Sequence, residues 1–197
     1  DRLPPLVPRE EKDISHLSDE MADVLYPGSR PRPFRMGLVF DAFLGEEYAR
    51  AMAEDLLGGE AKAVPGAGLE FPLEGEKRVW KPLVSRDAKV GLMPGVWPLQ
   101  ENAAAYAACW IDCEAETKAM LRLGSDDGYR AWLDGAELGA AVEARMFKWD
   151  QNAHEVTMPR GRHLLLLKLG TRIGAFEFGV RLTTKSFEVP KGVRIWN

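Results

Sequence analysis

The stretch GSDDGYRAWLDG, residues 124–135, decides the expected fold of this 197-residue chain. It begins and ends in Asp and Gly, which favour tight turns because both tolerate left-handed backbone and Asp also bonds its own main chain. Between the two turns, Tyr129, Ala131 and Leu133 occupy every second position, the spacing typical of a strand with one buried face. The stretch therefore predicts a short strand between two tight turns.

The second half of the chain repeats this organisation. Short apolar segments alternate with groups of Asp, Asn, Gly and Pro, which mark turns. Regular short strands with turn signals favour a sandwich or a barrel over an α/β fold. The fold class predicted is all-β, an antiparallel β-sandwich of the jelly-roll type. The expected strands are 104–112, 117–123, 129–134, 144–149, 153–158, 163–169 and 174–184.

The first half of the chain predicts one or two short helices. Apolar residues recur at helical spacing within 13–25 and again within 45–57. Residues 1–33 are rich in proline and are expected to be an N-terminal extension or linker. Residues 34–184 are then the sandwich domain, and residues 185–197 are a C-terminal extension or an edge strand.

Composition excludes two classes of partner. The net charge is −4, and no long basic stretch is present, so nucleic acid is not expected as a partner. The longest apolar run, 164–167, is far too short to span a membrane. Cys109 and Cys113 lie in one expected strand with their Cα atoms roughly 13 Å apart, which is too far for a disulfide. Two reduced thiols are therefore predicted.

Four segments together resemble a known family. They are residues 104–110, 123–128, 132–135 and 161–168, which read AAYAACW, LGSDDG, WLDG and GRHLLLLK. They are similar to the galactose-binding-like β-sandwich modules of bacterial carbohydrate-active and surface proteins. In those modules a Gly-Ser-Asp-Asp turn leads into a strand ending in Asn-Gly or Asp-Gly, and a later Gly precedes an Asn-x-Leu-Leu-x-Lys strand. This chain differs in having Arg162-His163 before the leucine run.

The resemblance implies a non-catalytic carbohydrate-binding module of a larger extracellular or periplasmic protein. Its partners would be a polysaccharide or other glycan and a neighbouring catalytic domain of the same polypeptide. One alternative is a structural or protein-interaction module that packs against such a catalytic domain. Another is a small polysaccharide-active enzyme, although the sequence contains no HExxH motif, no paired histidines and no nucleophile elbow.

Calcium is the one cofactor expected. Asp126 and Asp127 place adjacent carboxylates on a turn, and Ca²⁺ prefers carboxylate and carbonyl oxygens. The pair also resembles the Asp pair that helps to hold calcium in protective-antigen-like sugar-binding domains. The alternative is that Asp126 and Asp127 only accept hydrogen bonds from amides of the turn.

Trp149 is the best candidate for contact with a sugar ring. It directly precedes the polar residues Asp150 and Asn152, and Arg145 lies nearby in the sequence. Aromatic rings stack on the C–H faces of sugars, whereas Asp, Asn and Arg bond to sugar hydroxyls. Tyr129 completes the predicted ligand-binding set.

Other aromatic residues have alternative assignments. Phe147 is a further candidate ring for sugar stacking. Aromatic residues in strands more often pack in the core, and for Trp80 and Trp110 a core position is predicted.

Overall fold

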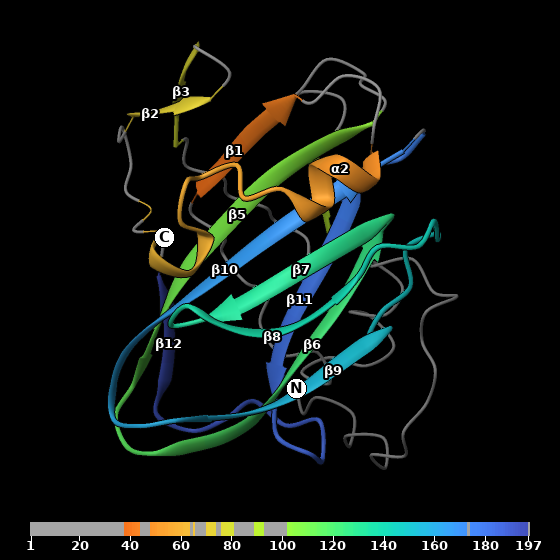
Figure 1. Cartoon of the computed structure of the whole chain (residues 1–197). Helices are drawn as coiled ribbons and strands as arrows, with labels where there is room; N and C mark the ends of the chain where they lie inside the picture. Colours follow the sequence, from red (N-terminus) through yellow and green to blue (C-terminus); the bar gives the residue numbers. More distant parts are fainter. Residues whose placement is uncertain are drawn as a thin grey trace, which may run out of the picture.

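Two antiparallel sheets form the layers of a β-sandwich (Figure 1). The structure is a computed structural model that describes residues 38–43, 48–63, 65, 70–73, 76–80, 89–92, 102–172 and 174–196. The six-stranded sheet contains, in spatial order, β1 (Leu38–Phe43), β5 (Ala103–Cys113), β10 (Gly161–Thr171), β7 (Gly128–Leu133) and β8 (Ala136–Ala141), with β12 (Val193–Trp196) also paired to β5. The four-stranded sheet contains β4 (Lys89–Gly91), β11 (Glu177–Thr183), β6 (Thr117–Asp126) and β9 (Asn152–Met158). The predicted all-β sandwich is confirmed.

The remaining described elements are short. Strands β2 (Glu70–Leu73) and β3 (Glu76–Val79) form a separate hairpin. Helix α2 (Tyr48–Ala53) and a single 3₁₀ turn, η1 (Glu60–Lys62), lie against the six-stranded sheet (Figure 1). The predicted helix within 45–57 is confirmed in this shorter form. The predicted helix within 13–25 lies outside the described residues, as does the whole of the segment 1–33.

The main core lies between the two sheets. Strand β10 contributes Leu165, Leu167 and Leu169, and β11 contributes Phe178 and Val180, all nearly inaccessible to solvent. Each such side chain stabilises the fold by roughly 1.5–3 kcal/mol relative to an exposed position. Strand β10 is buried on its other face as well, by the elements around α2. This explains why residues 164–167 are continuously apolar instead of alternating.

A second core lies on the outer face of the six-stranded sheet, under α2. Trp80, Met52, Trp132 and Leu166 pack there in one cluster. The prediction of a core position is thus confirmed for Trp80. For Trp110 it was wrong, because that side chain is only half-buried and belongs to neither cluster.

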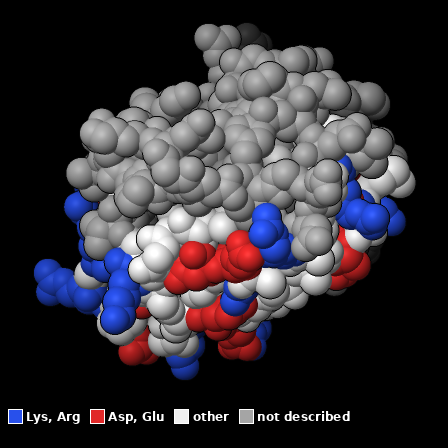
Figure 2. All heavy atoms as spheres, turned by 45° about the horizontal axis from the view of Figure 1, so that its top comes forward, with Lys and Arg blue, Asp and Glu red and all other residues white. Residues whose placement is uncertain are grey.

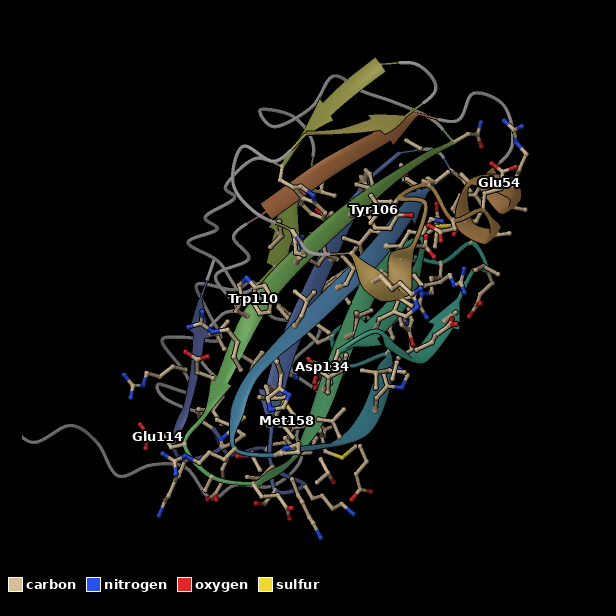
Figure 3. All side chains as sticks on the ribbon, turned by 60° about the vertical axis from the view of Figure 1, so that its left-hand side comes forward. Glu54, Tyr106, Trp110, Glu114, Asp134 and Met158 are labelled. Atoms are coloured by element: carbon tan, nitrogen blue, oxygen red, sulfur yellow. The ribbon has the colours of Figure 1, made fainter. Side chains whose placement is uncertain are left out.

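A buried polar network is embedded in this second core. Tyr106, Lys168 and Arg130 are directly opposite one another on β5, β10 and β7. Glu60 of η1 accepts hydrogen bonds from the Tyr106 hydroxyl and from Lys168 Nζ, the latter at 2.9 Å, and its second carboxylate oxygen lies 3.7 Å from Arg130. Lys168 also donates to the carbonyl of Glu54. Figure 3 shows Tyr106 on β5 close to α2 and η1, with Trp110 further along the same strand.

Burial perturbs the proton affinities of this network. It lowers the pKa of Lys168, although the Glu60 carboxylate opposes the shift, and it raises the pKa of Tyr106, as does the hydrogen bond to Glu60. Each partner therefore depends on the others for compensation of its lost hydration. The network attaches the α2–η1 segment to three strands of the sheet.

Within residues 102–184, one predicted strand was wrong and one observed strand was missed. Residues 144–149 form a loop, in which the Arg145 amide donates to the Asp127 carboxylate and the Met146 carbonyl accepts from the Gln151 side chain instead of pairing with a strand. The missed strand is β8, which follows directly from the Asp134–Gly135 turn. Its sequence, AELGAA, lacks the β-branched and aromatic residues that mark strands.

Two further expectations can be compared with the structure. Cys109 and Cys113 are both free, as predicted; both are also buried, which raises the pKa of each thiol. The C-terminal segment supplies β12, which runs antiparallel to β5 from Val193 opposite Cys113. Within the described part of the chain, no helix has the length and apolar character needed to cross a membrane.

Candidate functional site

Two aromatic rings rest on the outer face of the four-stranded sheet. Phe147 and Trp149 belong to the loop 142–151, and their ring centroids are 5.1 Å apart with an interplanar angle of 82°. Both side chains are half-exposed. We call this pair the aromatic ledge. It lies on the face opposite the core, because successive residues of a strand point to opposite sides of a sheet and Phe178 and Val180 of β11 point inward.

Two paired glycines make room for the aromatic ledge. Gly124 of β6 and Gly179 of β11 are register partners. A Cβ atom on Gly124 would lie 1.9 Å from the carbonyl oxygen of Lys148, and one on Gly179 would lie 2.6 Å from Cζ3 of Trp149. No side chain larger than hydrogen fits at either position without moving the loop. Glycine in a strand interior commonly marks such a close approach.

Ion pairs border both rings. The guanidinium of Arg181 lies 5.2 Å from the Trp149 ring centroid and forms a two-pronged ion pair with Asp150, with Nε to Oδ1 at 3.0 Å. Lys89 Nζ lies 5.6 Å from the Phe147 centroid and pairs with Glu177 at 3.0 Å. Cations over aromatic faces are attracted by the ring quadrupole, so these contacts also orient the rings.

Arg145 fastens the base of the loop to the sandwich. Its Nε donates to the carbonyl of Asp127 at 3.0 Å, and its two terminal nitrogens donate to Asn152 Oδ1 at 2.8 Å and Ser125 Oγ at 2.7 Å. The guanidinium also lies 5.4 Å from the Tyr129 ring centroid. These four partners come from β6, β7, β9 and the turn between β6 and β7. Arg145 therefore connects three strands to the loop that carries the aromatic ledge.

We call Arg145 with its partners Asn152 and Tyr129 the clamp. Tyr129 of this clamp forms a neutral pair with a histidine. Tyr129 is fully buried, and its hydroxyl lies 2.9 Å from Nε2 of His154. Burial raises the pKa of Tyr129 and lowers the pKa of His154, so both side chains are uncharged near neutral pH. The pair connects β7 of one sheet to β9 of the other and contributes to packing between the two sheets.

Asp127 organises the backbone around the β6–β7 turn. Its Oδ1 accepts the amide of Arg145 at 3.0 Å and its Oδ2 accepts the amide of Arg172 at 2.6 Å. Asp126 is half-buried, and burial together with the Asp127 carboxylate raises its pKa. Burial, with a contribution from Asp127, also raises the pKa of the nearby Tyr48 to about 12. Asp127 thus binds amides of two separate loops.

The fit of these carboxylates to calcium can be judged from the donor set. Ca²⁺ takes six to eight oxygen ligands. Among the described residues, no three His, Cys, Asp or Glu side chains lie close enough together to hold a metal ion. The described side chains of Asp126 and Asp127 do not make a calcium cage by themselves, and calcium binding stays a prediction.

The predicted ligand-binding residues fall into two groups. Trp149 and Asp150 lie at the aromatic ledge, whereas Arg145, Asn152 and Tyr129 form the clamp behind it. The residues that sequence reasoning missed come from other strands. These are Lys89, Gly124, Glu177, Gly179 and Arg181. The signal that could have indicated two of them is glycine inside an otherwise strand-like segment.

A separate ionisable cluster joins the β7–β8 turn to β10. His163 Nδ1 lies 2.6 Å from Asp134 Oδ2, and Nε2 lies 2.8 Å from the carbonyl of Pro159. Both partners are acceptors, so the ring satisfies both only when each nitrogen carries a proton. Burial opposes the charged form, but the bonds to Asp134 and Pro159 outweigh it and raise the pKa of His163. Asp134 also accepts the amide of Leu164 at 2.8 Å.

Comparisons with known proteins give distant likenesses only. No family model matches the sequence, and no curated protein matches it. One similar solved structure is the PA14 domain of the antifreeze protein MpAFP, with 13% identity over 42% of this chain and 44% of that chain at a TM-score of 0.37. An anti-sigma factor domain-containing protein has 11% identity over 78% and 44% of the two chains at a TM-score of 0.47.

A third similar structure is a GH31 α-xylosidase from Xanthomonas citri, with 11% identity over 62% of this chain and 15% of that chain at a TM-score of 0.37. The chain thus spans less than half the length of each of these three proteins. The class of the protein is defined by its own two sheets, as an antiparallel β-sandwich with one short helix among the described residues.

Proposed function

We propose that this sandwich is a non-catalytic module that binds glycan at the aromatic ledge. The observation that carries the proposal is the pair of half-exposed rings, Phe147 and Trp149, held on two glycines beside the Asp150–Arg181 ion pair. Aromatic faces pack against the apolar side of a sugar ring, and a neighbouring carboxylate and guanidinium bond its hydroxyls. Rigid rings lose little conformational entropy when a ligand binds.

The clamp supports the same proposal. Arg145 donates all its bonds to groups of the protein and is largely buried, so its part in binding is to position the loop. Asn152 and Tyr129 act with it. In this proposal the module belongs to a larger extracellular or periplasmic protein and delivers a neighbouring catalytic domain to its polysaccharide. Calcium at Asp126 and Asp127 would stabilise the β6–β7 turn, to which Arg145 of the clamp donates a hydrogen bond.

The direct test is affinity electrophoresis of the chain through gels that contain single polysaccharides. The Trp149→Ala variant is expected to lose retention while its melting temperature stays close to that of the wild type, because the ring is half-exposed. Trp110→Ala is the matched control, since it removes another half-buried tryptophan from a different sheet. Equal retention of wild type and Trp149→Ala would refute the proposal.

A second function is favoured by a separate observation. Val142 and Met146, in the same loop, are 48% and 76% exposed, and they are two of the three large apolar side chains that are exposed among the described residues. Contiguous exposed apolar patches commonly mark protein contacts, and these two residues are four positions apart in one loop. The second candidate is thus a structural module whose loop 142–151 packs against a neighbouring domain. Retention on no polysaccharide, with Met146→Lys weakening a contact to that domain, would favour it.

A further inference from the structure

We infer that the aromatic ledge takes single chains of neutral glycan and discriminates against anionic polysaccharides and flat crystalline surfaces. The inference rests on the proposed glycan-binding function and adds the class of ligand. Two observations carry it: the angle between the rings and the pairing of the charges around them.

The rings do not form a flat surface. Their planes meet at 82°, and the glycine pair beneath them leaves room for that arrangement, because a Cβ on Gly179 would lie 2.6 Å from Cζ3 of Trp149. A crystalline polysaccharide presents many sugar rings in one plane and needs aromatic residues that are coplanar. Perpendicular rings instead contact one sugar on its face and its neighbour on its edge. Such contacts suit one flexible chain.

The charges beside the rings are already paired. Arg181 is engaged by Asp150 and Lys89 by Glu177, so an anionic sugar would have to displace a carboxylate of the protein to reach either cation. Glu143 near the start of the loop and Asp126, which accepts a hydrogen bond from the backbone of Phe147, add further negative charge. A uronate or a sulfate ester would therefore be repelled, or its binding would cost the free energy needed to separate an ion pair of the protein. Hydroxyl groups can bond to both pairs without separating them.

The mixed charge is also visible on a larger scale. Where Figure 2 shows described side chains, acidic residues lie beside basic ones. Lys148 is the exposed cation of the loop, and its side chain offers the simplest anchor for an anionic ligand. It therefore serves as a discriminating position: neutral glycan has no use for its charge, whereas an anionic glycan has.

The test compares three groups of probes with the full chain. They are soluble neutral polysaccharides (arabinoxylan, galactomannan and mixed-linkage β-glucan), anionic polysaccharides (polygalacturonate and alginate), and microcrystalline cellulose in a pull-down. We expect retention on at least one neutral probe, lost by a factor of about ten or more in Trp149→Ala. We expect Lys148→Ala to bind like the wild type, and binding to be unchanged between about 0.02 and 0.5 M NaCl.

Each outcome has a defined meaning. Retention that depends on Trp149 but occurs on polygalacturonate or alginate, falls with salt and falls in Lys148→Ala would overturn the ligand class while leaving the glycan site intact. Pull-down by cellulose that depends on Trp149 would also overturn it. Retention on no probe, or retention that Trp149→Ala leaves unchanged, would refute the proposed function itself and the inference with it.

Discussion

Both sheets of the sandwich carry aromatic and charged side chains on their outer faces, yet the two faces use them differently. On the six-stranded sheet, Tyr106, Lys168 and Glu60 are buried under the α2–η1 segment and bond only to groups of the protein. On the four-stranded sheet, Phe147 and Trp149 keep part of their surface in solvent. The same types of residue therefore serve architecture in one place and are offered to a ligand in the other.

Burial separates the two roles for the aromatic rings and for the half-exposed Lys89–Glu177 pair, whereas Arg181 beside Trp149 is as buried as Glu60. A buried ion pair has paid the cost of dehydration, so removal of one partner leaves a charge uncompensated. An exposed ion pair is screened by water, so its loss costs little. We therefore expect large effects on stability from changes at the covered face, and large effects on binding with small effects on stability from changes at Trp149 and Lys89.

The largest expected effect on stability is that of Lys168→Met. It leaves Glu60 buried with only the more distant Arg130, 3.7 Å away, as a cation, and loss of one partner from a buried ion pair typically costs about 3–5 kcal/mol of unfolding free energy. The measurement is chemical denaturation followed by tryptophan fluorescence. Lys89→Met is the matched control, because its partner Glu177 is half-exposed, and it should cost at most about 1 kcal/mol. Equal losses in the two variants would erase the distinction between the faces.

Gly124→Ala should have an intermediate effect on stability and a large one on binding. The new Cβ would lie 1.9 Å from the Lys148 carbonyl, so the loop must move away from the sheet. Overpacking of this kind costs about 1–3 kcal/mol. Retention on the glycan should fall as far as in Trp149→Ala, although no ring has been removed. Unchanged retention would mean that the position of the loop does not matter for binding.

A smaller effect is expected from the protonation of His163. Its folded-state pKa is raised, so the charged ring stabilises the fold fully below its unfolded pKa of about 6.5, and this contribution is lost as the pH rises through the folded pKa. Wild type should therefore lose its advantage over His163→Gln as the pH increases, which urea denaturation between about pH 5 and pH 9 can follow.

The difference between wild type and variant is the quantity to compare in that experiment. His154, whose pKa is lowered by burial, acts in the opposite direction and loses its contribution as the pH falls. It is present in both proteins, so it cancels. An advantage of the wild type that is constant with pH would show that His163 is not charged in the fold.

The smallest effect is expected from calcium. If Asp126 and Asp127 hold the ion, millimolar calcium should raise the melting temperature by at most a few degrees, since binding to the folded state stabilises it by mass action. The rise should be absent in Asp126→Asn, which leaves the amide-binding carboxylate of Asp127 in place. A wild-type melting temperature that does not respond to calcium would contradict calcium binding by Asp126 and Asp127.

Local patterns predicted most of the sandwich, because strand alternation and turn residues are written into short segments. The same reasoning placed a strand at 144–149, because the turn residues 150–152 follow that segment. It could not foresee that the Arg145 amide would donate to the carboxylate of Asp127, 18 residues earlier, instead of to a neighbouring strand. The missed strand β8 has a composition without strand-forming residues.

The candidate site was only half accessible from the sequence. Trp149 and Asp150 are adjacent, so their combination could be read directly. Arg181 and its partner Asp150 are 31 residues apart, and Lys89 and Glu177 are 88 residues apart. No local sequence pattern predicts either contact. The buried pair of Glu60 and Lys168 is separated by 108 residues and has the same character.

The most direct test of the glycan site follows the indole N–H signals of the tryptophans by NMR during titration with a neutral oligosaccharide. The Trp149 and Trp110 signals can be assigned from their alanine variants. If glycan binds at the aromatic ledge, the Trp149 signal shifts in a saturable manner, whereas the Trp110 signal does not shift. A Trp149 signal that does not move while another tryptophan responds would contradict it.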